Sequence, residues 1–190
     1  EIWLSWKLDG LTLVATYNDG NLSTLVTRGN GVEGNNITYL SRAIAGLPDR
    51  IEHSGHLVVR GEATISYTDF ELINDTVEED EKYANPRNLA SGTLNLDDVE
   101  KVKERHVSFN AFTLVHTDEA LSSWGKRMEL LERLGFKVVD REKTDADGIG
   151  ECIERWTARV EDGSMDIPVD GLVLCYEDND YAMSGSVTGH

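Results

Sequence analysis

Residues 5–10, Ser-Trp-Lys-Leu-Asp-Gly, set a lysine in an apolar run, followed two positions later by a carboxylate and then by glycine. Side chains alternate along a strand, so Lys7 and Asp9 are expected on one side, where the carboxylate would orient the amine. A nucleophilic lysine needs burial or nearby cations to lower its pKa from about 10.4. Gly10 allows a bend, so that a second strand can start at once. A surface strand ending in a turn has the same pattern.

The next residues predict an antiparallel opening. Residues 11–17 alternate with the period of a strand, 18–21 form a tight turn, and 22–27 return as its partner. Further strands are expected at 57–66, 107–116, 136–139 and 171–176. Helices are expected at 37–47 after the N-cap Asn36, 68–74 from a capping box at Thr68, 97–104, 121–134 closed by Gly135, and 149–160, where Trp156 is assigned to the core.

Four more blocks follow the lysine block in order. They are T-R-G-N-G-V-E-G at 27–34, V-R-G-E at 59–62, A-N-P-R-N-L-A-S-G-T-L at 84–94 and V-D-G-L-V-L at 169–174. Together with K-x-D-G, this series resembles the adenylation (nucleotidyltransferase) domain of NAD-dependent bacterial DNA ligases. The T-R-G-x-G and A-N-P-R-N blocks resemble these enzymes far more than ATP-dependent ligases or capping enzymes.

The resemblance implies an α+β nucleotidyltransferase fold, the ATP-grasp-like fold of DNA ligases and mRNA capping enzymes, with antiparallel sheets flanked by helices. Residues 1–190 would form one adenylation domain, a fragment without the upstream NMN-binding module and the downstream OB, helix-hairpin-helix and BRCT modules. The implied enzyme is a ligase of DNA replication and repair. A lysine attacks the AMP phosphorus of NAD to form lysyl-AMP, and AMP then passes to the 5′-phosphate of nicked DNA.

The resemblance also implies the site residues. Lys7, Asp9 and Asp170 would be catalytic; the nucleotide would be bound by Ser5, Lys7, Arg28, Glu62, Arg87 and Cys175; and Mg²⁺ would be held by Glu62 and Asp170. The residue types suit these roles, since arginine forks match phosphate oxygens and a carboxylate in an apolar strand needs a partner. An ion pair with Arg60 is the structural alternative for Glu62. Residues 85–96 could equally be a tightly folded buttress.

Four positions depart from the family pattern. Ser5 stands where the family usually has glutamate, Asn30 where it has aspartate, Asn95 where it has arginine, and Cys175 where it has lysine. A final lysine block is expected soon after His190. These departures leave open a degenerate domain that binds an adenine nucleotide or a partner without ligating. A third alternative is an ATP- or GTP-using relative such as an RNA ligase.

Charge limits the partners. The formal net charge of −17 disfavours autonomous binding to DNA, so nicked duplex would be bound through the missing domains. The two cysteines, Cys152 and Cys175, make neither a disulfide framework nor a metal motif and fit a reducing cytoplasm. No apolar run is long enough for a membrane span, and a monomer is expected. His53 and His56 are assigned to a solvated loop.

Overall fold

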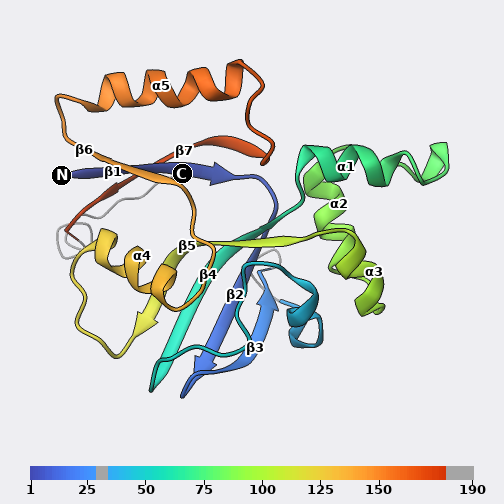
Figure 1. The fold of residues 1–190 in the computed structure, drawn as a ribbon, viewed down its shortest axis with the longest axis horizontal. Helices are drawn as coiled ribbons and strands as arrows, with labels where there is room; N and C mark the ends of the chain where they lie inside the picture. Colours follow the sequence, from blue (N-terminus) through green and yellow to red (C-terminus); the bar gives the residue numbers. More distant parts are fainter. Residues whose placement is uncertain (29–33, 179–190) are drawn as a thin grey trace.

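The computed structural model describes residues 1–28 and 34–178, and within them the strands form two antiparallel sheets (Figure 1). The smaller sheet has the order β6-β1-β7, with β6 at Arg141–Thr144, β1 at Ile2–Leu8 and β7 at Val169–Tyr176. The larger has the order β3-β2-β4-β5, with bounds Asn21–Thr27, Leu11–Asn18, His56–Thr64 and Ser108–Thr117. The α+β architecture with antiparallel sheets is confirmed.

Gly10 carries the chain from the smaller sheet to the larger one. A Cβ at this position would lie 2.0 Å from the carbonyl oxygen of Ala63 in β4, so no larger residue fits without moving that strand. Just before it, the amide of Asp9 donates to the carbonyl of Pro168 at 2.9 Å. The bend therefore keeps β1 and β4 close together, although they belong to different sheets.

The predicted hairpin of β2 and β3 is confirmed. Asp19 and Gly20 have φ of 46° and 85°, the left-handed pair that a two-residue hairpin turn requires. Along β2, Leu13, Ala15 and Tyr17 are fully buried, while the residues between them face the other side of the sheet. One face of the larger sheet thus packs into the hydrophobic core, and the other face is turned toward the smaller sheet.

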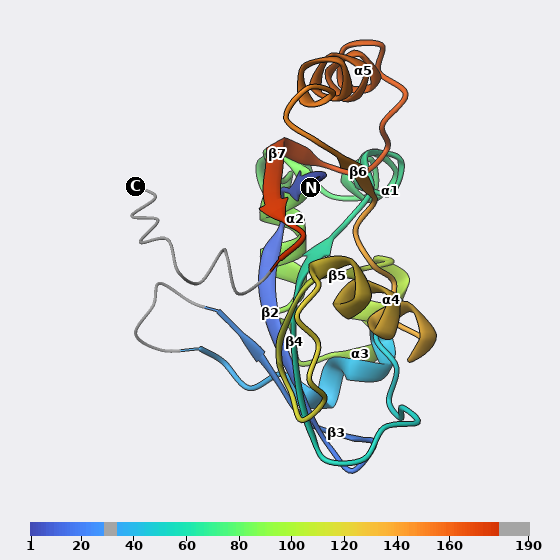
Figure 2. The same ribbon diagram turned by 90° about the vertical axis from the view of Figure 1, so that its left-hand side faces the viewer.

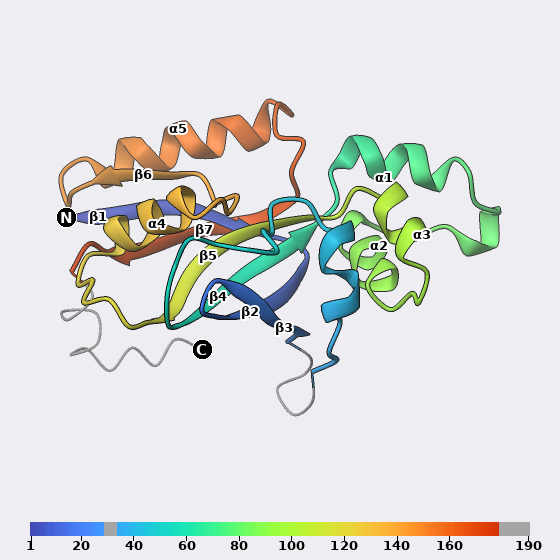
Figure 3. The ribbon, with the colours of Figure 1, turned by 60° about the horizontal axis from the view of Figure 1, so that its bottom comes forward.

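The helices occupy distinct sides of the two sheets. α1 (Tyr67–Asn74), α2 (Pro86–Thr93) and α3 (Val99–Glu104) gather at one end of the larger sheet (Figure 3). α4 (Trp124–Arg133) packs on β5. α5 (Ile149–Glu161) lies over the smaller sheet, on the side away from the larger one (Figures 1 and 2). There Trp156 stacks at 4.5 Å on Trp6, which confirms that Trp156 is a core residue.

Several predicted elements differ in the structure. The helix expected at 37–47 is reduced to a 3₁₀ helix, η1 (Thr38–Ala43), because Ile44 is already extended and Ala45 bridges to Ser108. The cap of α1 is Ser66, whose hydroxyl accepts from the amide of Asp69, and Thr68 instead bonds to Asp166. The acidic run at 75–81 is exposed, with a single 3₁₀ turn, η2 (Glu79–Glu81).

The strand expected at 136–139 was placed too early. Those residues make only one bridge, between Val138 and Ala111, and the strand is β6. β6 reads Arg-Glu-Lys-Thr and lacks apolar alternation, because its side chains form ion pairs such as Lys143 with Glu1 at 2.8 Å. These residues form a strand because their backbone pairs with β1, and not because of a hydrophobic pattern.

Candidate active site

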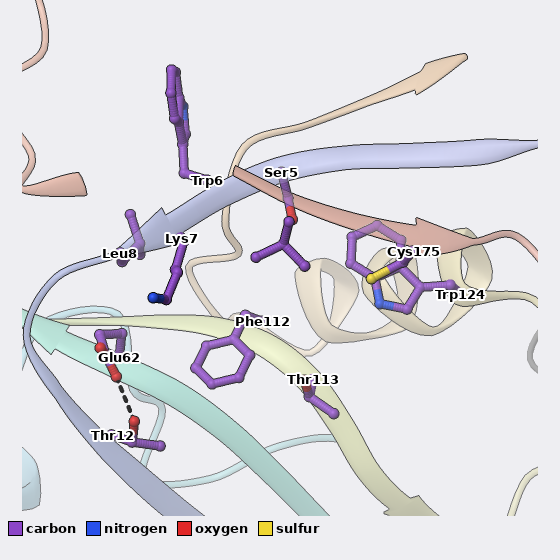
Figure 4. Close-up of a pocket in the computed structure, with 11 residues that line it drawn as sticks. Ser5, Trp6, Lys7, Leu8, Thr12, Glu62, Phe112, Thr113, Trp124 and Cys175 are labelled. Atoms are coloured by element: carbon purple, nitrogen blue, oxygen red, sulfur yellow. Dashed lines mark hydrogen bonds between the residues drawn. The ribbon is translucent and has the colours of Figure 1, made fainter. Parts of the chain in front are cut away.

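A cavity of about 340 Å³ lies between the two sheets (Figure 4). Strands of both sheets and the first residue of α4 supply its walls. The lining residues are Ser5, Trp6, Lys7, Leu8, Thr12, Glu62, Phe112, Thr113, Trp124, Val173 and Cys175. Besides Lys7, the lining includes three predicted site residues: Ser5 from β1, Glu62 from β4 and Cys175 from β7.

Lys7 lies near the end of β1, where the register of the β1–β7 ladder shifts between Lys7 and Leu8. Its Nζ is 3.6 Å from Oδ2 of Asp170, and both side chains are half exposed. Asp170 sits at the start of β7 and reaches Lys7 because Gly171 is the direct partner of Lys7 in the ladder. The sequence predicted both as catalytic, and the fold brings them together.

Asp9 is not the ion-pair partner of Lys7, although the alternation argument placed the two side chains on one side. β1 ends at Leu8, so the two side chains do not continue one strand face. Instead, Oδ1 of Asp9 lies 3.7 Å from Nη1 of Arg87. Lys7 is paired with Asp170, whereas Asp9, the carboxylate of the K-x-D-G block, pairs with Arg87 of the A-N-P-R-N block.

Glu62 faces the cavity from the middle of β4, directly opposite Thr12 on β2. Its carboxylate accepts from the Thr12 hydroxyl at 2.7 Å and from the Gly10 amide at 3.3 Å. Burial raises the pKa of Glu62, and these two hydrogen bonds act against that rise. The partners of Glu62 in the structure are thus the Thr12 hydroxyl and the Gly10 amide, and the alternative of an ion pair with Arg60 is wrong.

Arg60 itself lacks a partner in the part of the chain that the structure describes. Its Nε is buried without a hydrogen bond. Burial lowers the pKa of Arg60, and the nearby charge of Arg28 lowers it further. Arg28 leaves β3 with its amide bonded to the Thr12 carbonyl at 2.8 Å and does not line the cavity. The glycine-rich stretch that follows, including Asn30, lies outside the described residues.

Residues 85–96, which the sequence left open between a nucleotide-binding block and a tightly folded buttress, contain the helix α2 at Pro86–Thr93. The side chain of Asn85 caps α2 by accepting from the Asn88 amide at 2.8 Å, and Pro86 occupies the first turn. Arg87 follows at once, so the helix start directs this arginine toward Asp9. Asn95, beyond the helix, is exposed.

Ser5 and Cys175 lie further from Lys7 in the same cavity. Ser5 and Lys7 point to one side of β1 and Trp6 to the other, so strand alternation places both in the site (Figure 4). Cys175 enters from β7, where burial raises the pKa of its thiol. Ser5 and Cys175, two of the four positions that depart from the family pattern, therefore line the cavity.

Two aromatic lining residues were missed. Phe112 is the extra residue of a β-bulge, since Arg60 pairs with Thr113 and Gly61 with Ala111. Only the pairing with β4 reveals this irregularity. Trp124 was expected on the apolar face of a helix, and its place in the cavity wall at the helix start was not foreseen.

Glu177, also missed, holds Trp124 in place. Its carboxylate accepts from the indole of Trp3 at 2.6 Å, from the Gly125 amide at 3.2 Å and from the Ser123 hydroxyl. Its carbonyl accepts from the Trp124 amide at 2.9 Å. An acidic residue at a helix start is favourable, so Glu177 joins the start of α4 to the smaller sheet.

His53 and His56, which the sequence assigned to a solvated loop, differ in the structure. The His53 side chain is only 6% exposed, with Nδ1 3.5 Å from Oε1 of Glu119, so its assignment to solvated loop is wrong. His56 opens β4 and is exposed. Within residues 1–28 and 34–178, no group of three or more His, Cys, Asp or Glu side chains is arranged to hold a metal ion.

The cavity therefore combines a lysine amine paired with a carboxylate, a second carboxylate bonded to a hydroxyl, and an aromatic wall. An amine can attack phosphorus or carbonyl carbon, and carboxylates can bind sugar hydroxyls or cations. The volume suits a ligand of moderate size.

Comparison with known proteins identifies the family. The family model described as NAD-dependent DNA ligase adenylation domain matches residues 1–185. The DNA ligase of Ruminiclostridium cellulolyticum is 43% identical over 95% of this chain and 28% of its own length. The DNA ligase of Lachnoclostridium phytofermentans is 40% identical with the same coverage. The chain thus spans less than a third of these relatives.

Solved structures share the fold. The ligase domain of LigD from M. tuberculosis matches with a TM-score of 0.53 at 19% identity, over 93% of this chain and 49% of that one. A mycobacterial DNA ligase D complexed with ATP and MES gives a TM-score of 0.52 at 17% identity, over 93% and 48%. The predicted nucleotidyltransferase fold is confirmed. Among the described residues, no helix has the length and apolar character needed to cross a bilayer.

Proposed function

The chain belongs to the family of NAD-dependent DNA ligase adenylation domains, and on that premise we propose that it transfers AMP from NAD to Lys7. One observation carries the proposal: Lys7 and Glu62 line a single cavity, and Asp170 lies 3.6 Å from the amine. A bound nucleotide can therefore reach all three groups at once.

In the proposed step, the neutral amine of Lys7 attacks the phosphorus of the AMP half of NAD. The new P–N bond forms as the P–O bond to nicotinamide mononucleotide breaks, the leaving oxygen keeps the electron pair, and the proton that the amine loses passes to water. Asp170, which pairs with the ammonium form of Lys7, would orient the neutral amine by accepting a hydrogen bond from it. Lys7 is half exposed, which gives the incoming phosphate access to it.

The proposed roles of the other residues follow from their contacts. Glu62 and Thr12 offer oxygen atoms suited to a ribose hydroxyl. Arg87 can exchange its ion pair with Asp9, which is long at 3.7 Å, for phosphate oxygens. We assign Arg28 to the same phosphate-binding role, although it lies outside the cavity wall. Ser5 and Cys175 are assigned to the nucleobase.

The proposal includes Mg²⁺. This ion is usually held by one or two carboxylates together with substrate phosphates and water, so a site without a cluster of protein ligands is compatible with it. Asp170 and Glu62 would supply those carboxylates. When bound, the ion neutralises charge that grows on the phosphoryl oxygens.

The activity of the whole protein is also a proposal, since the chain spans only 28% of the first relatives. We propose that residues 1–190 are the adenylation domain of a longer monomeric, cytoplasmic ligase of DNA replication and repair. AMP would pass from Lys7 to the 5′-phosphate of nicked duplex DNA. The net charge of −17 supports binding of that duplex by other modules.

Mass spectrometry tests the first step. The complete natural protein is incubated with NAD and Mg²⁺, and the adduct is mapped by peptide analysis. We expect one AMP on Lys7, and sealing of nicked DNA in the same protein. The isolated chain is expected to react poorly with NAD, because the module that orients the leaving half is missing. An adduct on another lysine, or none in the complete protein, would reject the proposal.

A further inference from the structure

Arg105 is a buried cation that the proposed reaction does not use. It is the C-cap residue of α3 and is only 9% exposed. In the part of the chain that the structure describes, its side-chain partners are hydroxyl groups and an aromatic ring, not a carboxylate. Burying a charge without an opposite charge is unfavourable, and an apolar side chain of similar volume is often at least as stable in such a place. Stability alone therefore does not explain this arginine.

The Arg105 side chain reaches the last residue of α2. Its Nη1 donates to the hydroxyl of Thr93 at 3.0 Å, and Thr93, which is fully buried, donates in turn to the Leu89 carbonyl at 2.7 Å. The guanidinium also lies over the ring of Tyr83, 5.7 Å from its centroid, and Nη1 is 3.4 Å from the Tyr83 hydroxyl. These contacts join α3 to the C-terminal end of α2.

Tyr83 is itself held on both sides. Its backbone amide and carbonyl bond to the side chain of Asn74, the last residue of α1, at 3.0 and 2.9 Å. Its ring packs on α2 at Gly92, where a Cβ would lie 2.9 Å from Cε1 of the ring. Figure 3 shows the three helices together at this end of the molecule. Arg105, Thr93 and Tyr83, which we call the α2 clamp, thus connect all three.

The orientation of α2 depends on such contacts because the helix is short. Eight residues are too few for a helix to be stable alone, so its surroundings must hold it. Leu89 and Ala90 are fully buried in the core, but apolar contacts are not directional and do not by themselves fix the rotation of a helix. The hydrogen bond from Arg105 to Thr93 is directional. The clamp therefore sets the rotation of α2 about its axis.

Arg87 is the second residue of the same helix. It lies about 9 Å from Thr93 along the axis, so a rotation at the clamp also moves Arg87. The ion pair of Arg87 with Asp9 is long, at 3.7 Å, and solvated, so it is too weak to hold the helix. The proposed function, on which this inference rests, requires Arg87 to meet phosphate oxygens. A misplacement of about 1 Å can lower a rate about a hundred-fold.

We propose that Arg105 is a positioning residue for AMP transfer, which fixes α2 through Thr93 and Tyr83 in the orientation that presents Arg87 to the phosphate. Arg105 acts through Arg87 and does not touch the nucleotide. The unfavourable burial of its charge is offset by a single orientation of the helix that carries Arg87.

Rates of AMP transfer to Lys7 in the complete natural protein test this proposal. Arg105→Met keeps an unbranched side chain and removes the charge and the donor. At saturating NAD the rate should fall at least about ten-fold, because Arg87 is misplaced. The NAD concentration that gives half the maximal rate should change less than about three-fold, since the other contacts with the nucleotide remain. A rise in that concentration at an unchanged maximal rate would contradict a positioning role.

Two comparisons exclude a general loss of structure. The urea midpoint of Arg105→Met should stay within about 0.5 M of the wild-type value, since Thr93 keeps its bond to Leu89. A larger fall would show that Arg105 supports the fold as a whole. Lys103→Met, the matched control, removes an exposed cation from the same helix and should leave the rate within about two-fold. A ten-fold loss in that control would show that the effect is one of charge alone.

A double-mutant cycle shows whether Arg105 acts through Arg87. When Arg87 is already alanine, Arg105→Met should lower the rate further by less than about two-fold. An equal loss in both backgrounds, or a rate that Arg105→Met leaves unchanged, overturns the inference while the proposed function stands. If the wild-type protein carries no AMP on Lys7, the proposed function itself fails. If Arg87→Ala keeps the full rate, the phosphate-binding role of Arg87 is wrong and the inference falls with it.

Thr93→Val provides the same test if Arg105→Met does not fold. This variant keeps the branched shape of the side chain and removes the hydroxyl that accepts from Arg105. The rate should fall in the wild-type background and should not fall further when Arg87 is alanine. A folded Thr93→Val protein with the wild-type rate would show that α2 is oriented without the clamp.

Discussion

The two ends of β1 are held in opposite ways. At its C-terminal end, Lys7 meets Asp170 at 3.6 Å, and beyond it Asp9 meets Arg87 at 3.7 Å, with side chains largely open to solvent. At its N-terminal end, the Glu177 carboxylate is only 17% exposed and accepts several short hydrogen bonds. It also pairs with Lys143 at 3.0 Å.

This difference separates the part of the strand that holds the fold from the part to which we assign the reaction. A carboxylate with several fixed donors costs much to release, so the Glu177 end anchors α4 and the pocket wall. Long, solvated ion pairs cost little to break, so Lys7 and Arg87 can leave their partners for a phosphate. One short strand thus has a rigid end, the anchor at Glu177, and an exchangeable end, where the ion pairs of Lys7 and Asp9 can be replaced by contacts with a phosphate.

The largest effect should follow from removing the amine at the exchangeable end. Lys7→Ala should abolish AMP transfer to the protein, since no other group can form the P–N bond. Lys7→Arg is the control that keeps the charge and the ion pair with Asp170 but not the nucleophile, and it should be equally inactive. Mass spectrometry of the complete protein measures the adduct. If either variant still carried AMP, Lys7 would not be the residue that receives it.

The next effect concerns the anchor. Glu177→Gln should lower the free energy of unfolding by about 2 kcal/mol, because an amide cannot accept from all the donors that now face the carboxylate. Glu1→Gln is the control, since Glu1 also pairs with Lys143 but is exposed, and it should cost less than about 0.5 kcal/mol. Urea unfolding measures both. Equal losses would show that Glu177 is an ordinary surface charge.

The anchor should also respond to acid. Burial alone would raise the pKa of Glu177, but bonds from Ser123, Lys143 and Trp3 outweigh it and hold the pKa at about 2. This value lies below that of an unfolded glutamate, about 4.3, so the stabilisation is present above that pH and is lost as pH falls toward 2. Thermal unfolding from pH 5 to 2.5 should show the loss, with a shallower slope in Glu177→Gln. Parallel slopes would contradict this coupling.

The smallest effect is expected from the ion pair beside the site. Asp9→Asn removes the partner of Arg87, and the free energy of unfolding should change by less than about 0.5 kcal/mol, since the pair is long and solvated. Urea unfolding checks this against Glu177→Gln under the same conditions. A loss above about 1.5 kcal/mol would show that both ends of the strand are anchors and would remove the contrast between them.

The sequence predicted the site better than its supports. Lys7, Glu62 and Asp170 could be placed together because each lies in a recognisable block. Glu177 could not be foreseen, since its role depends on a helix start more than fifty residues earlier in the chain. Phe112 escaped notice because a bulge is a property of two paired strands, not of one.

The helix predictions show the same limit. The apolar spacing of residues 37–47 is helical, and the side chains that define it are buried as expected: Ile37, Leu40, Ile44 and Leu47. Pairing of Ala45 with Ser108 nevertheless ends the helix early, because a tertiary contact outweighs a local preference. For β6, the charged side chains gave no pattern to detect, and only β1 beside it makes it a strand.

The pairing of β1 also sets an order of assembly. β1 is synthesised well before its two partner strands, which lie at residues 141–144 and 169–176. The larger sheet uses only residues 11–117 and can form while the ribosome is still adding the rest. Such distant pairing is slow to close. The nascent chain therefore carries Lys7 on a strand without either partner until β6 emerges, and the cavity between the two sheets is complete only once β7 has been added.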